Sequence, residues 1–195
     1  MKIFFIILSA LVFIFLVVQI FAMSSQQGIE TYPYELINKY KDIEIRKYEA
    51  SLFTSVELST NKYEEASGAG FSILASYIFG GNDKKEKIAM TSPVSISLDE
   101  SMTMMFMVPR DLKKEDLPRP DKDNIEFKEI PEKTVAAISF GGWANSEKIE
   151  KYKANLKAAL DAEGIAYTDK YYFLGYNAPY EVINRKNEII VELVQ

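Results

Sequence analysis

The chain has 195 residues, and 23 Lys and Arg stand against 28 Asp and Glu, which gives a net charge of −5. An acidic chain lacks the basic face that nucleic acid selects, so we expect no nucleic-acid partner. The sequence contains no Cys and no His. This excludes a disulfide framework, a thiolate nucleophile, and the commonest general base and zinc ligand. The carboxylates show no spacing that converges on one point, and we predict that the protein is not an enzyme.

The N-terminal segment is a nearly unbroken apolar run over residues 3–23, with Ser9 and Gln19 as its polar interruptions. About 20 apolar residues are needed to cross a bilayer, so residues 1–23 are predicted to form a transmembrane anchor. Lys2 and the amino terminus place the leading side in the cytoplasm, and the rest of the chain is then expected outside it. Residues 24–28 are expected to be a short polar tether.

A cleaved signal peptide is the alternative for this segment, because Ala22, Met23 and Ser24 resemble a cleavage site with small flanking residues. Cleavage would leave a secreted or periplasmic protein. The apolar run is longer than the usual signal core of about 7–15 residues. We therefore favour the uncleaved anchor.

Residues 29–195 are predicted to form one α+β domain, large enough to bury a core. In its first half, apolar and polar residues alternate as they do in strands. These predicted strands cover residues 43–48, 52–58, 87–98 and 102–108. Asn61 with Glu64 three positions later resembles a helix start. The helix that follows is expected to stop at Gly80, and one face of it recurs at spacings of three and four: Tyr63, Ala66, Gly70, Leu74 and Tyr77.

The second half repeats this order after a connector over residues 111–123, which is rich in charge and Pro. Its predicted strands cover residues 125–130, 134–140, 171–174 and 188–193. A helix is predicted over residues 146–163, with Gly164 at its C-terminal cap, and its buried face carries Ile149, Tyr152, Leu156 and Leu160. Both halves thus contain two strands, a helix and two strands. The fold expected from this order is a distorted antiparallel β-barrel of two pseudo-symmetric halves with two helices packed outside it, preceded by the N-terminal hydrophobic helix.

Two residue clusters suggest ligation chemistry but fit core packing better. The first comprises Met90, Met102, Met104, Met105 and Met107. Thioether sulfur can ligate soft metals, yet flexible Met side chains also fill irregular barrel interiors. The second is the Tyr residues of the helix and the closing region. A phenolate can hold iron, but Tyr at a barrel rim ordinarily buries its ring and keeps its hydroxyl wet.

Several segments in order resemble the SOUL family of haem-binding proteins. The most specific is residues 77–96, YIFGGNDKKEKIAMTSPVSI. The others are YEASLFTSVEL (48–58), MFMVP (105–109), LPRP (117–120), FGGWA (140–144) and LGYNAPYEVINRKNEIIVE (174–192). The resemblance runs from about Ile29 to the end of the chain.

This resemblance implies noncatalytic binding of haem or another tetrapyrrole, a small flat hydrophobic ligand, on the first helix and on the loop before the last strand. Apolar side chains would take the macrocycle and basic ones the propionates, without a required axial His. The residues carried over are Phe71, Leu74, Tyr77, Ile78, Tyr176, Tyr180, Arg185 and Lys186. The helix departs from the expected pattern, since Lys62 is its sole basic residue between positions 61 and 83.

Two glycines, Gly68 and Gly70, lie inside the predicted helix, where each costs about 1 kcal/mol relative to Ala. Such residues indicate close approach of another surface, either a flat ligand or the barrel wall. Other functions consistent with the same fold are an effector-binding or protein-interaction module that does not bind haem, and a purely structural surface domain.

Overall fold

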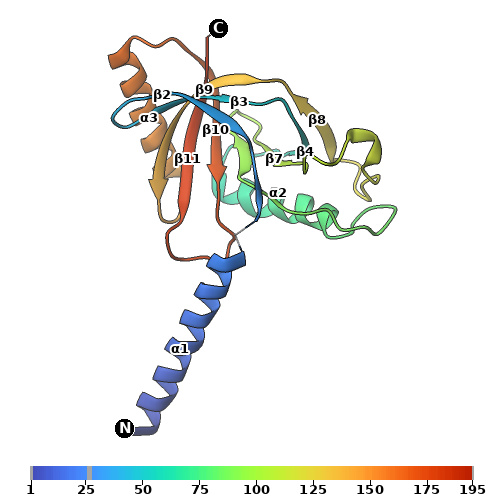
Figure 1. Ribbon diagram of the computed structural model, residues 1–195, viewed down its shortest axis with the longest axis vertical. Coiled ribbons are helices and arrows are strands. Elements are labelled where there is room, and N and C mark those ends of the chain that lie inside the picture. The colour runs from blue at the N-terminus through green and yellow to red at the C-terminus, as the bar shows by residue number, and fades with distance from the viewer. Residues whose placement is uncertain (1, 26–27, 195) are drawn as a thin grey trace.

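The computed structural model describes residues 2–25 and 28–194 (Figure 1). Its helices are α1 (Lys2–Ser25), α2 (Tyr63–Ile78) and α3 (Ser146–Glu163), with a 3-10 turn, η1, at Lys114–Asp116. The first-half strands are β1 (Glu30–Thr31), β2 (Tyr34–Lys39), β3 (Glu44–Tyr48), β4 (Ser51–Glu57), β5 (Thr91–Ser92), β6 (Val94–Ser97) and β7 (Thr103–Met107). The second-half strands are β8 (Glu126–Ile130), β9 (Lys133–Gly141), β10 (Tyr167–Gly175) and β11 (Lys186–Leu193).

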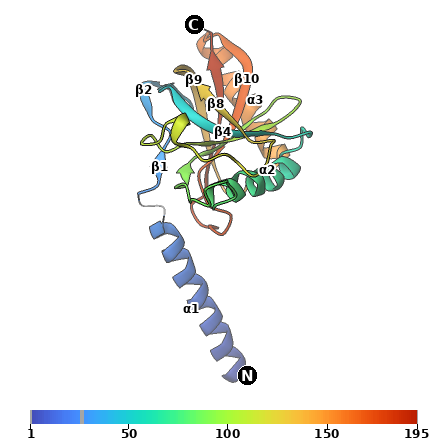
Figure 2. The same cartoon turned by 90° about the vertical axis from the view of Figure 1, so that its right-hand side faces the viewer.

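The main sheet has nine antiparallel strands in the order β2-β3-β9-β11-β10-β6-β7-β4-β8. Apart from β2, this order is symmetric about the boundary between β10 and β6. At corresponding places in this order, β3 of the first half pairs with β9 of the second, and β8 of the second half pairs with β4 of the first. The sheet curls into a half-barrel whose edges do not close (Figures 1 and 2). The predicted α+β fold of two similar halves with two packed helices is confirmed.

The two faces of the curled sheet carry separate cores, because successive strand residues point to opposite sides. In β11, Ile189 and Val191 join the larger cluster, which also contains Leu74 of α2 and Leu156 of α3. Ile190, between them, joins the smaller cluster on the concave face. The predicted core role is supported for Met102, Met104, Met105 and Met107, which are all buried, whereas Met90 is partly buried and lines a cavity.

Both domain helices end where Gly was expected to end them. Gly80 has a φ of 106° and Gly164 a φ of 67°, a region that Gly adopts without a steric penalty. At the start of α3, the side chain of Asn145 accepts a hydrogen bond from the Lys148 amide. The expected start of α2 was wrong, because its N-cap is Lys62, with no side-chain capping bond.

Three other local expectations differ from the structure. The strand expected over residues 87–98 forms only as β5 and β6, since the Ile88 amide bonds back to the Ile78 carbonyl at the end of α2. The strands β1 and β2 were not predicted; β2 is exposed along its whole length and so lacks the usual alternation. Of the expected tether, residues 24 and 25 belong to α1, and residues 26 and 27 lie outside the described residues.

The N-terminal apolar helix extends away from the domain (Figures 1 and 2). Its segment from Lys2 to Gln19 is long and apolar enough to cross a membrane, a property that signal sequences share. The loop between β10 and β11, residues 176–185, lies at the end of the domain that faces α1 (Figure 1). We call it the rim loop.

Candidate functional site

A groove runs between α2 and the rim loop on the convex side of the sheet. It consists of two adjoining cavities, of about 490 Å³ and about 320 Å³. Both cavities are lined by Phe71, Val94, Gly175, Asn177 and Pro179. This is the pair of elements on which the sequence resemblance places the ligand.

Of the four α2 residues proposed from sequence, only Phe71 reaches these two cavities. Leu74, Tyr77 and Ile78 are buried in the main core. The Tyr77 hydroxyl donates a 2.9 Å hydrogen bond to the Pro118 carbonyl. Packing between α2, the sheet and the 111–123 connector therefore accounts for these three side chains.

The two glycines of α2 have different surroundings. A Cβ on Gly70 would lie 2.9 Å from Leu58 Cδ1 and 3.0 Å from Met104 Cβ, so this residue allows the helix to approach the sheet closely. A Cβ on Gly68 would meet no atom within 4 Å. Gly68 lines the larger cavity and leaves room in it, whereas Gly70 serves the barrel wall.

Arg185 is the basic residue that lines the larger cavity. Its Nη1 donates to the carbonyls of Ala178 and Glu181, which closes the rim loop on itself. Its guanidinium carbon lies 4.0 Å from the centre of the Trp143 ring, a cation–π distance. Its Nε is buried and finds no acceptor among the described residues. Leaving a buried donor unpaired costs free energy.

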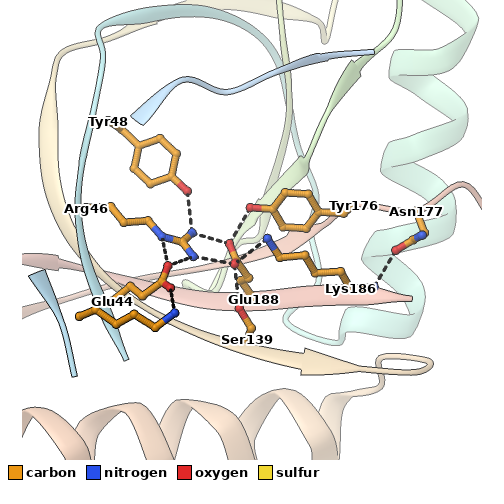
Figure 3. A network of polar contacts seen from close by, with 9 residues as sticks. Glu44, Arg46, Tyr48, Ser139, Tyr176, Asn177, Lys186 and Glu188 are labelled. Atoms are coloured by element: carbon orange, nitrogen blue, oxygen red, sulfur yellow. Dashed lines mark hydrogen bonds and ion pairs between the residues drawn. The ribbon is translucent and has the colours of Figure 1, made fainter. Parts of the chain in front are cut away.

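Lys186, the other proposed cation, lies on the opposite side of the sheet. Its Nζ is 3.1 Å from Glu188 Oε1 and 4.2 Å from the centre of the Tyr176 ring (Figure 3). Adjacent residues at the start of β11 thus face opposite ways, and the structure does not bring Lys186 into the groove with Arg185.

Glu188 is the centre of a buried polar network on the concave face (Figure 3). Arg46 binds its carboxylate in a bidentate manner, with Nη1 at 2.8 Å from Oε2 and Nη2 at 2.9 Å from Oε1. The Ser139 hydroxyl donates to Oε1 at 2.8 Å. The Tyr176 hydroxyl donates to Oε2 at 2.6 Å. Because Tyr176 begins the rim loop and lines the smaller cavity, this network holds one wall of the groove in place.

Near neutral pH, Glu188 is ionised and the Tyr176 phenol is neutral. Burial raises the pKa of Glu188, but the hydrogen bonds and charge of Arg46 outweigh that effect and hold the pKa at about 2. Burial, together with the nearby Tyr48 and Glu188, raises the pKa of Tyr176 well above its usual value of 10.0. Burial also raises the pKa of Tyr63, which lines the larger cavity. Neither of these two phenols forms a phenolate near neutral pH.

The acidic residues beside the groove are engaged by the protein. The carboxylate of Glu64 in α2 accepts from the Ser146 amide at 2.7 Å and from the Ser146 hydroxyl at 2.5 Å. Buried Glu181 accepts from Asn177 at 2.8 Å and from the Ala178 amide at 3.1 Å. Across residues 2–25 and 28–194, no group of three or more Asp or Glu carboxylates could hold a metal ion.

Sequence reasoning missed several groove residues. Trp143 lines the larger cavity, and Ile29 and Phe79 line the smaller one with Tyr180. Trp143 lies in the FGGWA segment between two predicted elements, and its place in one of the segments that resemble the family was the available signal. Phe79 and Ile29 follow directly after a helix end and after the tether, where sequence patterns carry no information about burial.

Comparison with known proteins gives a consistent picture. Residues 29–192 match the family model described as SOUL heme-binding protein. Heme-binding protein 2 of Homo sapiens is 31% identical over 155 residues, covering 75% of this chain and 75% of that protein. Heme-binding protein 1 of Sus scrofa is 29% identical over 174 residues, covering 83% and 92%. Among solved structures, the EcmrR C-terminal domain aligns with a TM-score of 0.61 at 12% identity, over 83% of this chain and 98% of that one, a likeness of fold alone.

Proposed function

This chain belongs to the SOUL heme-binding protein family, and we propose that it binds haem or a related tetrapyrrole in the groove between α2 and the rim loop, without catalysing a reaction. The names of its relatives support the ligand class. The observation that carries the site is the pair of adjoining cavities between the two elements on which the family resemblance places the ligand.

The shape and lining of the groove support a flat apolar ligand. Small-molecule sites commonly occupy about 300–1,000 Å³ and are lined mainly by apolar side chains with a few polar groups. The two cavities, of about 490 Å³ and 320 Å³, fall in this range. Phe71, Val94 and Pro179 form the shared apolar lining. They would cover the faces of a macrocycle.

Arg185 is the propionate partner in this proposal. Its side chain lines the larger cavity beside the exposed Trp143 ring, which places the guanidinium charge at the cavity wall. Lys186 has no part in it, because its ammonium pairs with Glu188 on the concave side.

Binding would depend on burial of the ligand ring and on the ion pair between Arg185 and a propionate. The sequence has no His, and the Tyr176 hydroxyl donates to Glu188 on the concave side, away from the groove. We therefore expect moderate affinity. Burial of the apolar ring contributes about 25 cal/mol per Å² of surface removed from water, and no strong iron–protein bond adds to it.

We place the domain outside the cytoplasm, anchored to the membrane by α1. Support comes from the apolar span at Lys2–Gln19 and from Lys2, whose charge favours a cytoplasmic amino terminus. If the leader is cleaved, the domain would be secreted or periplasmic with the same groove.

Titrating the full chain with hemin in lipid nanodiscs tests the proposal, with empty nanodiscs subtracted. The variant Arg185→Gln keeps a donor for the loop carbonyls and removes the charge. We expect it to weaken hemin binding roughly 3- to 10-fold, as loss of one partly buried ion pair implies, and to leave hemin dimethyl ester unaffected, because the ester carries no propionate charge. The matched variant Lys186→Gln should change neither ligand. Absence of saturable hemin binding would refute the proposed function, and equal effects on hemin and its ester would refute the role of Arg185.

A further inference from the structure

The end of α1 is joined to the rim loop by a polar side chain. Gln19 donates from Nε2 to the Tyr180 carbonyl at 3.3 Å and accepts at Oε1 from the Val182 amide at 3.1 Å. Its side chain is buried, although it sits in an otherwise apolar helix. The pairing satisfies both the Gln19 amide and two backbone groups of the loop, which is what a low-water environment demands of polar groups.

The outer surface of the rim loop is apolar. Tyr180 is 59% exposed, and Val182 and Ile183 are each 41% exposed. Between residues 176 and 183 the sole charged residue is Glu181, which is buried and turned toward the Asn177 and Ala178 amides. Aromatic and aliphatic side chains with no exposed charge are typical of segments that lie in the interface of a bilayer.

The length of α1 gives the depth of this loop. A helix rises 1.5 Å per residue, and the hydrocarbon core needs about 20 residues. The membrane-spanning segment Lys2–Gln19 rises about 27 Å, close to the thickness of the hydrocarbon core, so Gln19 lies at the far boundary of that core. The loop backbone that pairs with Gln19 is therefore level with the membrane interface.

The groove opens at the same level. Its smaller cavity is lined by Tyr180 of the rim loop, by exposed Phe79 at the end of α2, and by Ile29. Ile29 lies four residues after the end of α1 at Ser25, so the extended chain places it within about 14 Å of that end. The cavity mouth is thus held close to the point where α1 leaves the bilayer.

We propose that the rim loop docks into the surface of the bilayer that α1 crosses, so that the groove exchanges its amphiphilic ligand directly with that lipid leaflet. This inference rests on the proposed function for the identity of the ligand and on the uncleaved anchor. Tyr180, Val182 and Ile183 supply the docking surface, and Gln19 fixes its depth. A planar amphiphile such as a tetrapyrrole partitions into lipid, so a groove facing the leaflet would capture it without passage through water.

The absence of Cys allows a test with single labels in the full chain. Val182→Cys is labelled with an environment-sensitive fluorophore in vesicles that contain lipids with a nitroxide near the headgroup. Val194→Cys is the control, because Val194 is also exposed and lies at the C-terminal end of the domain, away from α1 (Figure 1). We expect blue-shifted, strongly quenched emission at position 182 and water-like, unquenched emission at 194. Water-like emission at both positions would overturn the docking.

A second measurement tests ligand exchange. The double variant Val182→Asp, Ile183→Asp alters residues that line neither cavity. We expect the rate of hemin transfer from donor vesicles to fall at least 5-fold, with equilibrium affinity in detergent changed less than 2-fold. An unchanged rate would overturn exchange through the leaflet. Quenching at position 182 without any hemin binding would retain the docking and refute the proposed function, so the two failures are distinguishable.

Discussion

The hydroxyl of Tyr176 donates a 2.6 Å hydrogen bond to Glu188, whose side chain is fully buried on the concave face of the sheet (Figure 3). Tyr176 is a lining residue of the groove, while its ring packs on the concave-face cluster and its hydroxyl belongs to the network around the Arg46–Glu188 ion pair. One side chain thus couples the ligand-facing loop to the concave face of the half-barrel. The same hydrogen bond therefore positions a residue of the groove wall and contributes to the stability of the domain.

The first prediction concerns this hydrogen bond. Tyr176→Phe keeps the ring and removes the donor to a buried carboxylate, so the free energy of unfolding should fall by roughly 1.5–3 kcal/mol. The position of the haem Soret band should not change, because the Tyr176 hydroxyl is held by Glu188 on the concave side, away from the groove. Chemical denaturation and absorbance spectra check both points. A shifted Soret band in the variant would contradict the packing role.

The second prediction concerns acid stability. The folded-state pKa of Glu188 is about 2, below the ordinary 4.5. Its carboxylate therefore stabilises the fold fully above pH about 4.5, and this contribution, roughly 3 kcal/mol, is lost as pH falls toward 2. Unfolding free energies measured between pH 7 and pH 2.5 should show the loss.

Glu188→Gln supplies the control for that profile. The variant should be less stable at pH 7, because it removes one of the two carboxylates that pair with the buried Arg46 and leaves Glu44 as the other. Its stability should then vary less between pH 4.5 and 2.5 than that of the unaltered chain. Parallel pH profiles for the two proteins would show that other carboxylates control the acid transition.

The third prediction contrasts two glycines of one helix. Gly68→Ala should raise the free energy of unfolding by about 0.5–1 kcal/mol, because its Cβ meets open space and Ala favours the helix. Gly70→Ala should lower it, because overpacking against Leu58 and Met104 costs about 1–3 kcal/mol and exceeds the propensity gain. Thermal unfolding of both variants checks the opposite signs. Stabilisation by both would mean that the helix does not press on the sheet at Gly70.

The fourth prediction uses Trp143, the single Trp of the chain, as a probe of the groove. Its ring is exposed beside Arg185, so iodide should quench its fluorescence in the free protein. A groove ligand that does not absorb in the range of Trp emission should protect it from iodide. Equal iodide quenching with and without a saturating ligand would place the ligand elsewhere.

Sequence patterns predicted the fold well where the spacing of apolar residues indicates which face of an element is buried. The spacing of Leu74, Leu156 and Leu160 identified helices that pack on the sheet, and Gly80 and Gly164 ended them as expected. The short or fully exposed strands β1 and β2 have no such pattern and were missed. Their pairing depends on partners far away in the chain, which local sequence does not specify.

The groove was predicted at the level of elements, but not of side chains. The resemblance identified α2 and the rim loop, whereas an apolar residue on a helix does not reveal which face it takes. Phe71 faces the groove and Leu74, three positions later, faces the core. Likewise, Arg185 and Lys186 are neighbours in sequence, and only the geometry at the start of β11 separates the groove cation from the network cation.

The most direct test of the central claim fills the groove without disturbing the fold. Gly68→Phe should project a ring into the larger cavity, where a Cβ meets no atom within 4 Å. Gly68→Ala serves as its matched control. In hemin titrations of the full chain in nanodiscs, we expect Gly68→Phe to lose at least 10-fold in affinity while it remains at least as stable as the unaltered chain. We expect Gly68→Ala to bind hemin normally. Unchanged hemin affinity in a folded Gly68→Phe protein would contradict a haem site in this groove.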